Sequence, residues 1–305
     1  MTRLHLAIPV AAVLLSGCVS TLTRTELAAE YYNLGNAYFE LERYDESAAF
    51  LSRALELDES LARASYNLAR VYTELDRLDE AAELLEQLLA ADPQNVLLLE
   101  TAGFVAYEQG DLSGAATFYD LALEQSPADT DLLKNRATIA NALGNDGTAA
   151  ELLERAVALA PQESALLQRL SEAYRRQARP SEAADALERY LEQEPDDDSA
   201  RLTLAMLYVS QEFYSEALEV LEAITQPTAQ SAFLQARVLL VEAGDAEAGL
   251  QALQNAVSLG FSDGDQIDEL IANPDLVARE RVESFLAESA PAAGEQPDSD
   301  NDEEE

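Results

Sequence analysis

The sequence predicts an all-α array of about seven helical hairpins, and a strict period of 34 residues is the main reason. Prolines and small residues both keep this spacing, at Pro93, Pro127, Pro161 and Pro195, and at Ser47, Ala81, Ala115, Ala149, Ala183 and Ala217. Within a period, apolar residues recur twice with helical spacing, for instance at Tyr31, Leu34 and Tyr38 and then over residues 48–55. A single hairpin cannot bury its apolar face alone, so neighbouring hairpins are expected to stack into a solenoid.

The first element is an export signal. Arg3 precedes a run of 12 mostly apolar residues, Leu4 to Leu15, whereas a membrane span needs about 20. The run ends in Leu15-Ser16-Gly17-Cys18, which resembles the bacterial lipoprotein signal. The resemblance implies that residues 1–17 are removed and that Cys18, the only cysteine, carries the lipid. An ordinary signal peptide with an incidental cysteine is the alternative.

The residues after Cys18 bear on where the chain is anchored. Val19 stands where lipoproteins retained in the inner membrane often carry Asp, so the resemblance favours the periplasmic face of the outer membrane. Residues 18–25 are the lipidated cysteine and a short polar tether. At about 3.3 Å per extended residue the tether reaches roughly 20 Å, so the folded part is expected close to the lipid surface.

The repeats themselves carry a second resemblance. The first unit shows Tyr31, Leu34-Gly35, Tyr38, Tyr44 and Ala54, and the third adds Gly103, Gly110-Asp111, Ala115, Ala122 and Pro127. This pattern resembles the tetratricopeptide repeat family over residues 26–260. Seven repeats start near Ala28, Ala62, Val96, Thr130, Ser164, Asp198 and Gln230. The resemblance implies a right-handed superhelical solenoid of helix-turn-helix units.

Physical reasons support these positions. Small residues at the eighth and twentieth places let the two helices of a hairpin approach closely, and proline at the thirty-second place ends the second helix. Three places depart from the pattern: Arg237 replaces a small residue, Arg179-Pro180 replaces the inter-helix turn of the fifth repeat, and the sixth repeat is two residues short. We therefore expect the stacking angle to change near residues 226–229.

Two segments follow the last repeat. Residues 261–288 resemble the closing helices of many such arrays, a short helix followed by a longer one, which would cover the apolar face of the last repeat. Residues 289–305 contain seven acidic residues, no basic residue, two prolines and a glycine. This acidic tail is expected to be disordered.

Composition excludes several functions. With 58 acidic and 19 basic residues, the formal charge of -39 would repel a polyanion, so no nucleic-acid partner is expected. The single histidine is His5 and the single cysteine is Cys18, so no His-based acid/base pair and no Cys/His metal cluster can form. The one lysine, Lys134, follows no glycine-rich loop. We expect no enzyme, no metal and no cofactor.

Charged clusters have simple interpretations. The acidic clusters at residues 196–198 and 263–268 fit no calcium-loop spacing, and helix capping with first-turn charge explains both. Arg175-Arg176 is the only basic pair after the signal sequence. A solvated helix face is the favoured interpretation of this pair, with a lipid or phosphate contact as the alternative.

The concave face lined by the first helices is the predicted binding surface. Family geometry places positions 2, 5, 6, 9, 12 and 13 of each repeat there, where six basic residues nearly balance seven acidic ones. An asparagine amide can donate to and accept from one peptide unit, and aromatic rings add contact area. Alternatively, asparagine at the sixth place is simply common in this family. The residues predicted to line a peptide-binding groove are Asn33, Asn36, Tyr66, Asn67, Arg70, Phe104, Tyr107, Asn135 and Arg169.

A known recognition mode of such arrays is not expected here. Some arrays clamp a terminal carboxylate with five polar residues from three successive repeats. Only Asn36 and Asn67 match that pattern, because Tyr32, Leu97 and Thr101 occupy the three basic places.

Together these features predict a lipid-anchored adaptor or scaffold that binds protein partners in bacterial envelope assembly. Resembling lipoproteins serve pilus or secretin assembly, wall hydrolases or export complexes, and the sequence does not choose among them. A chaperone-like holdase for unfolded clients in the periplasm is the alternative. A hydrolase that uses a pair of carboxylates is a remote one.

Overall fold

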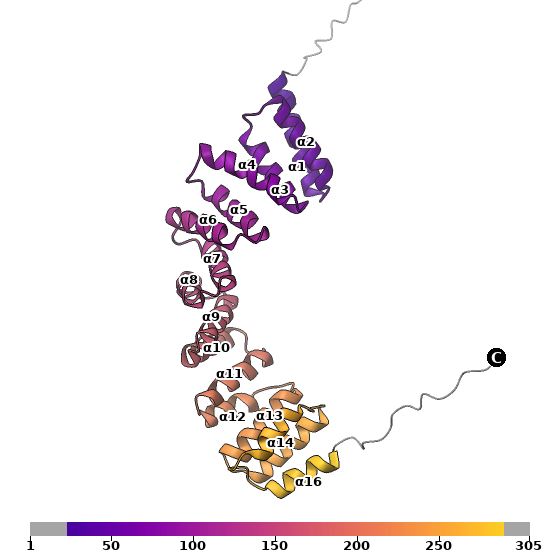
Figure 1. Cartoon of the computed structure of the whole chain (residues 1–305), viewed down its shortest axis with the longest axis vertical. Helices are drawn as coiled ribbons and strands as arrows, with labels where there is room; N and C mark the ends of the chain where they lie inside the picture. Colours follow the sequence, from indigo (N-terminus) through magenta and orange to yellow (C-terminus); the bar gives the residue numbers. More distant parts are fainter. Residues whose placement is uncertain (1–22, 290–305) are drawn as a thin grey trace, which may run out of the picture. The chain divides into compact units, whose positions relative to one another are not determined.

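The computed structural model describes residues 23–289, a succession of helices joined by short turns (Figure 1). They form two compact units, unit 1 ending at Gln125 and unit 2 beginning at Ser126. The predicted signal peptide, the lipidation site Cys18 and most of the tether lie outside the described residues, as does the acidic tail from residue 290 onward. None of the helices between residues 23 and 289 has the length and apolar character needed to span a bilayer.

Fourteen helices pair into seven hairpins. The first helices are α1 (Arg24–Glu40), α3 (Ala62–Glu74), α5 (Val96–Glu108), α7 (Thr130–Ala142), α9 (Ser164–Arg176), α11 (Asp198–Ser210) and α13 (Ala229–Arg237). Their partners are α2 (Tyr44–Leu57), α4 (Leu78–Ala91), α6 (Leu112–Gln125), α8 (Asp146–Leu159), α10 (Pro180–Gln193), α12 (Tyr214–Glu222) and α14 (Ala246–Ser258). The all-α repeat fold predicted from the sequence is confirmed.

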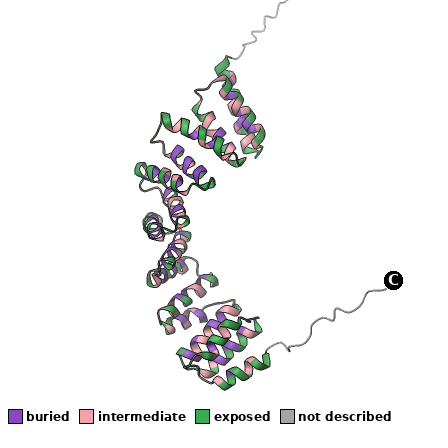
Figure 2. Cartoon of the chain, in the orientation of Figure 1, coloured by how far each residue is buried: buried purple, intermediate pink, exposed green. Residues whose placement is uncertain are grey.

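Small residues bring the two helices of a hairpin together, as the period predicted. The alanine at the twentieth place is fully buried in each repeat from the second to the sixth, at Ala81, Ala115, Ala149, Ala183 and Ala217. In the first repeat the Ser47 hydroxyl donates to the Gly35 carbonyl at 2.8 Å. A Cβ at Gly35 would lie 2.6 Å from Cγ of Leu51, so only glycine allows this approach. Buried residues accordingly follow the facing sides of paired helices (Figure 2).

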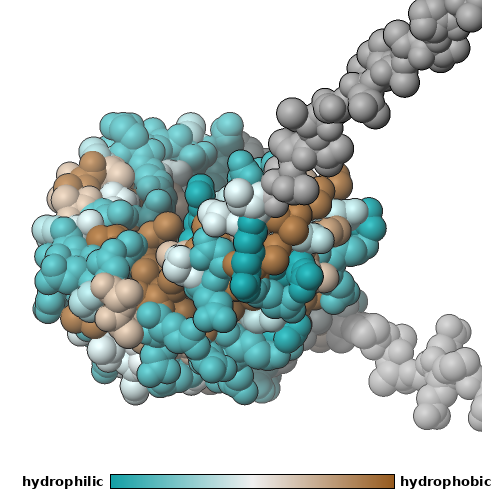
Figure 3. Space-filling model, turned by 90° about the horizontal axis from the view of Figure 1, so that it is seen from above, coloured by the Kyte–Doolittle hydropathy of each residue, from teal (hydrophilic) through white to brown (hydrophobic). Residues whose placement is uncertain are grey.

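Consecutive hairpins of unit 1 stack through two apolar clusters. One joins α2 to α3 and contains Leu51, Leu68 and Val71, and the other joins α4 to α5 and contains Leu85 and Leu98. Hydrophilic residues cover most of the surface in the space-filling view, with smaller hydrophobic patches between them (Figure 3). The core of unit 1 therefore contains two small clusters, one for each pair of neighbouring hairpins.

The turns inside the hairpins share one backbone feature. One residue in each turn has a positive φ, at Glu42, Asp76, Gly110, Gly144, Ala178, Glu212 and Gly244. A residue of this conformation at the end of a helix reverses the chain. Between hairpins, α4, α6, α8 and α10 each end two residues before a proline, where helix continuation is disfavoured.

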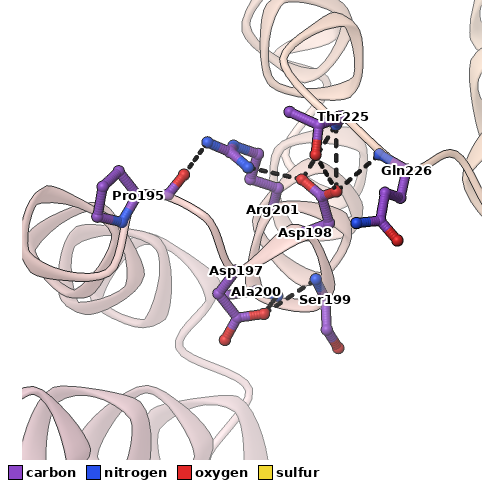
Figure 4. Close-up of polar contacts among 8 residues, drawn as sticks. All are labelled: Pro195, Asp197, Asp198, Ser199, Ala200, Arg201, Thr225 and Gln226. Atoms are coloured by element: carbon purple, nitrogen blue, oxygen red, sulfur yellow. Dashed lines mark hydrogen bonds and ion pairs between the residues drawn. The ribbon is translucent and has the colours of Figure 1, made fainter.

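The short sixth repeat has a distinct connection to the seventh. α12 spans only 9 residues, and residues 223–228 link it to α13. The Asp198 carboxylate accepts hydrogen bonds from the backbone N–H of Gln226 at 2.8 Å and from N–H and Oγ1 of Thr225 (Figure 4). Arg201 pairs with the same carboxylate at 2.6 Å. Asp198 therefore fixes the linker to the start of α11. The expected change in stacking angle stays a prediction.

The seventh repeat resolves the departure at Arg237. After α13 the chain continues as a π-helix, η1 (Val238–Glu242), in which the Ala243 N–H bonds back to the Val238 carbonyl at 2.9 Å. Close approach in this hairpin is made by Gly249, where a Cβ would lie 2.5 Å from Cγ of Leu240. The small residue at the twentieth place of this hairpin is a glycine, where the second to sixth repeats have alanine, and close approach depends on this glycine alone because Arg237 occupies the eighth place.

Two further helices, α15 (Gly264–Ala272) and α16 (Arg279–Ser289), close the described part. They bury Leu270 and Val282 in the apolar cluster of the seventh hairpin. Phe261 stacks on Phe233 with ring centroids 3.9 Å apart, and the Val277 N–H donates to the Leu240 carbonyl of η1 at 3.0 Å. These contacts cover apolar residues of the last repeat.

Candidate functional site

The candidate site is the A-helix face, defined as positions 2, 5, 6, 9, 12 and 13 of the first helices. In unit 1 it is carried by α1, α3 and α5, and in unit 2 by α7, α9, α11 and α13. Each unit's part of the face is treated separately, and the predicted groove residues divide between them. Seven belong to unit 1, whereas Asn135 and Arg169 belong to unit 2.

Two predicted groove residues of unit 1 bind each other. The side chain of Asn67 on α3 donates through Nδ2 to Oδ1 of Asn36 on α1 at 2.7 Å, and lies 3.4 Å from the Tyr32 hydroxyl. The sequence led us to expect that Asn67 projects freely from the face. In the structure its side chain is half-buried and bonded to Asn36. Between residues 23 and 289 no hydrogen bond uses Asn36 Nδ2 or Asn67 Oδ1. One donor and one acceptor therefore remain for a peptide unit.

The two arginines of this face lie on aromatic rings. The Arg63 guanidinium is 5.2 Å from the ring centroid of Tyr32, and the Arg70 guanidinium is 4.7 Å from that of Phe39 and 5.9 Å from that of Tyr66. Cation–π contacts of this kind hold a guanidinium in place while leaving its N–H groups exposed. Arg63 and Arg70 are both exposed, so they can donate to a carbonyl or carboxylate of a partner.

Apolar side chains complete the face of unit 1. Leu97, Phe104 and Tyr107 on α5 expose 52%, 46% and 36% of their surfaces. Asn33 on α1 is exposed as well. A hollow of about 280 Å³ opens between α3 and α5, lined by Arg63, Tyr66 and Leu97 among others. The structure therefore places an exposed amide on α1, exposed cations on α3 and exposed apolar and aromatic groups on α5.

In unit 2 the predicted groove residue Arg169 has a structural contact. Its Nη2 donates to the Lys134 carbonyl at 3.0 Å and to Thr138 Oγ1 at 2.6 Å, joining α9 to α7. Burial lowers the pKa of this guanidinium. Lys134 pairs with Asp131 at 2.6 Å and Glu163 at 3.0 Å, and hydrogen bonds to these carboxylates raise its pKa. Arg169 is half-buried and braces two helices, which leaves less of it for a ligand than the sequence suggested.

Other parts of the face of unit 2 are more open. A hollow of about 310 Å³ lies between α9, α10 and α11. Six of its lining residues are at predicted face positions, namely Gln168, Arg169, Glu172, Arg175, Ser199 and Thr203, and the other three are Ser171, Leu187 and Ala200. Asn135 is half-buried on α7. Arg175 and Arg176 are exposed and both pair with Glu172, at 2.6 and 3.1 Å, in agreement with a solvated helix face.

The acidic clusters are structural. Asp197 caps α11 by accepting from the N–H groups of Ser199 and Ala200, and Asp263 caps α15. The sequence predicted only that Asp198 supplies a negative charge in the first turn of α11. Its carboxylate also accepts hydrogen bonds from the linker after α12. Among residues 23–289 no cluster of carboxylates, histidines or cysteines could hold a metal ion.

Sequence reasoning missed the pairing of Asn36 with Asn67 across two repeats. Both were recognised as face residues, but their mutual contact depends on how far α3 is displaced from α1. The 31-residue separation of the two asparagines, three short of the period, was the available signal, because it brings position 9 of one repeat beside position 6 of the next.

The family comparison covers most of the repeats. One model, described as tetratricopeptide repeat, matches residues 31–101, 147–200 and 174–240, and a second with the same description matches residues 101–164. Together the matches span residues 31–240, more than half of the chain. No curated protein matches this sequence.

Solved structures agree in fold. A tetratricopeptide repeat protein from Parabacteroides merdae has a TM-score of 0.54 at 17% identity, covering 80% of this chain and 97% of its own. A crystal structure of MamA has a TM-score of 0.53 at 17% identity, covering 57% of this chain and 95% of its own. YrrB, described as having an unusual peptide-binding site, has a TM-score of 0.50 at 20% identity, covering 67% and 97%. At these identities the likeness concerns the fold, and with the sequence matches it shows that the chain belongs to the tetratricopeptide repeat family.

Proposed function

We propose that this chain is a lipid-anchored adaptor at the periplasmic face of the outer membrane, where it binds a protein partner during envelope assembly. The A-helix face of unit 1 is the proposed binding surface. The observation that carries the proposal is the exposed set Arg70, Leu97, Phe104 and Tyr107 on neighbouring helices. Large apolar side chains beside an arginine are the residue types that dominate protein interfaces.

The order of the side chains suggests how a partner would bind. Asn36 and Asn67 offer one donor and one acceptor to a backbone, and Arg70 offers its N–H groups to a carbonyl or carboxylate. Phe104 and Tyr107 would bury a nearby apolar side chain. Peptide binding by YrrB, a structural neighbour, supports this use of the fold. An extended segment of a partner is therefore the proposed ligand.

The test is a pair of variants compared in binding to a partner found by photo-crosslinking. A photo-reactive residue at position 104 of the full-length anchored chain would capture the partner for identification. Arg70→Ala with Phe104→Ala should then weaken binding at least about tenfold, which is about 1.4 kcal/mol. Asn67→Ala is less suitable, because loss of its bond to Asn36 would also lower stability by about 1 kcal/mol.

Leu121→Ala is the matched control, since Leu121 is 39% exposed on α6, outside the A-helix face. The control should bind as wild type does. Equal binding by wild type and the double variant would move recognition away from the face of unit 1. Crosslinks to many unfolded proteins, each bound weakly, would favour the holdase alternative over an adaptor with one partner.

Anchoring has a separate test, because Cys18 lies outside the described residues. The proposal expects Cys18→Ala to leave the chain without lipid and to shift it from the membrane fraction to a soluble or unprocessed form. Fractionation and the mass of the amino-terminal peptide measure this. An unchanged distribution and mass would contradict the lipid anchor and leave the binding proposal intact.

A further inference from the structure

Three repeats carry the same pair of residues at the same two positions. The pair lies outside the positions that define the A-helix face. A tyrosine at position 11 of the first helix is covered by an arginine at position 16. The guanidinium lies 4.7 Å from the ring centroid in Tyr38–Arg43, 4.0 Å in Tyr72–Arg77 and 4.5 Å in Tyr174–Arg179. In the sixth repeat Tyr208 is covered by the edge of Phe213 instead, with centroids 6.4 Å apart.

Like the fourth and seventh repeats, the third repeat lacks both members of the pair. Its position 11 is Ala106 and its position 16 is Asp111. At this place the structure has a hollow of about 360 Å³ between α4, α5 and α6. Its walls include Leu85, Leu89, Val105 and Phe118, and carboxylates of Glu86 and Asp111 lie at its margin. The hollow thus has apolar walls where the first, second and fifth repeats have a ring, and an acid where those three repeats have a cation.

A hollow in the fifth repeat shows what the tyrosine changes. It lies at the corresponding place between α8, α9 and α10, and Tyr174 forms part of its wall. The counterparts of Leu85, Val105 and Asp111, which are Leu153, Ala173 and Arg179, do not line it. The hollow of the fifth repeat still measures about 410 Å³, so the tyrosine and its arginine cover only the end nearest the turn, and this end stays open in the third repeat.

We propose that the hollow of the third repeat is a second docking site, which receives an aromatic side chain with a neighbouring arginine or lysine from a partner protein. The ring would take the place that Tyr72 and Tyr174 fill in their own repeats, against Leu85, Leu89 and Phe118. The basic group would lie beside Asp111 and Glu86. A chain with a net charge of -39 also attracts basic partners, so the chemistry of the site and the long-range field agree.

Asp111 allows the charge to be tested without disturbing the helix. One of its carboxylate oxygens accepts from the Gly114 N–H at 2.9 Å and so caps α6. Asparagine caps helices as well as aspartate does, so Asp111→Asn removes the charge and keeps the cap. Ala106→Tyr places at this end of the hollow the side chain that four other repeats carry at position 11, so the fold should tolerate it.

The experiment selects peptides from a random displayed library on the immobilised chain and measures their affinities for purified wild type and variants. Enriched peptides should pair an aromatic residue with an arginine or lysine. Ala106→Tyr should weaken their binding at least about tenfold, and Asp111→Asn should weaken it several-fold. Ala106→Ser, which leaves the hollow open, is the control and should bind as wild type does. Circular dichroism and melting verify that each variant is folded.

Three results would overturn the proposal: no enrichment, enriched peptides without the aromatic and basic pair, or peptides that bind Ala106→Tyr as tightly as wild type. The same peptides tested on Arg70→Ala with Phe104→Ala separate the two surfaces. Loss of binding there, with Ala106→Tyr unaffected, would place the peptides on the A-helix face. The experiment therefore tests this docking site independently of the proposed adaptor surface.

Discussion

Single residues with unusual backbone conformations are found in every inter-helix turn. Glycine holds the left-handed position in three of the seven turns, whereas Ala178 adopts φ 54° in the fifth, where its Cβ is unfavourable. We expect Ala178→Gly to raise the free energy of unfolding by roughly 0.5–1 kcal/mol, the steric relief being partly offset by the greater flexibility of glycine in the unfolded chain. Denaturant unfolding measures this, with Gly110→Ala as the reciprocal variant. A destabilised Ala178→Gly would contradict it.

Asp198 should make stability depend on pH in the acidic range. The backbone N–H of Gln226, followed by the contacts from Thr225, lowers the pKa of this carboxyl from 3.8 to about 2. Because the unfolded chain binds the proton first, the contribution of Asp198 is complete above about pH 4 and is lost as pH falls towards 2. Wild type should exceed Asp198→Asn in unfolding free energy at neutral pH, and the difference should shrink towards pH 2.

Asp196→Asn is the control for this pH dependence. It removes a charge two residues away, from a side chain that makes no hydrogen bond within residues 23–289. It should leave the pH dependence of unfolding close to that of wild type. An Asp198→Asn curve parallel to wild type over the acidic range would refute the role given to Asp198.

At the scale of the hairpin, the buried alanine at the twentieth place sets how closely two helices approach. Ala81 has no exposed surface and belongs to the cluster that joins α4 to α5. Ala81→Leu should overpack this contact and lower the free energy of unfolding by about 1–3 kcal/mol. Denaturant titration of Ala29→Leu, at an exposed place on α1, should shift by no more than about 0.5 kcal/mol. If both substitutions changed the free energy of unfolding equally, the hairpin would have space for a larger side chain at position 81.

The π-helix explains how the last hairpin receives its cap. Its wider turn leaves the Leu240 carbonyl available to accept from the Val277 N–H, and it brings Leu240 against Gly249. The cap helices then bury Leu270 and Val282 on the same cluster. The π-helix therefore helps to bind the closing helices to the seventh hairpin, through a hydrogen bond and a shared apolar cluster.

For the whole molecule, charge is the dominant physical property. A net charge of -39 costs stability through self-repulsion, which added salt screens. We expect the melting temperature to rise clearly as sodium chloride increases from low to molar concentration. Sodium sulfate is the control for general salting-out, because it strengthens burial in any protein. A flat or falling curve in sodium chloride would show that self-repulsion does not limit the stability of this chain.

The sequence by itself determined the class of fold, because the fold repeats a local rule. Proline at position 32 and a buried small residue at position 20 act within one hairpin, so each repeat gives independent evidence of the same element. The face that carries Asn36, Asn67 and Arg70 was implied by the resemblance to the family, whose geometry assigns the same positions in each repeat. Composition alone also excluded a site built on histidine or on paired cysteines.

Tertiary structure decided the features that depend on two repeats at once. Asn67 is joined to Asn36, Arg169 braces α9 against α7, and the Asp198 carboxylate reaches the linker after α12. The hollow at Ala106 likewise exists only because α4, α5 and α6 meet there. A period shows which residues share a position, whereas the distance between neighbouring helices determines which of their side chains touch, and that distance is set by the packing of whole hairpins.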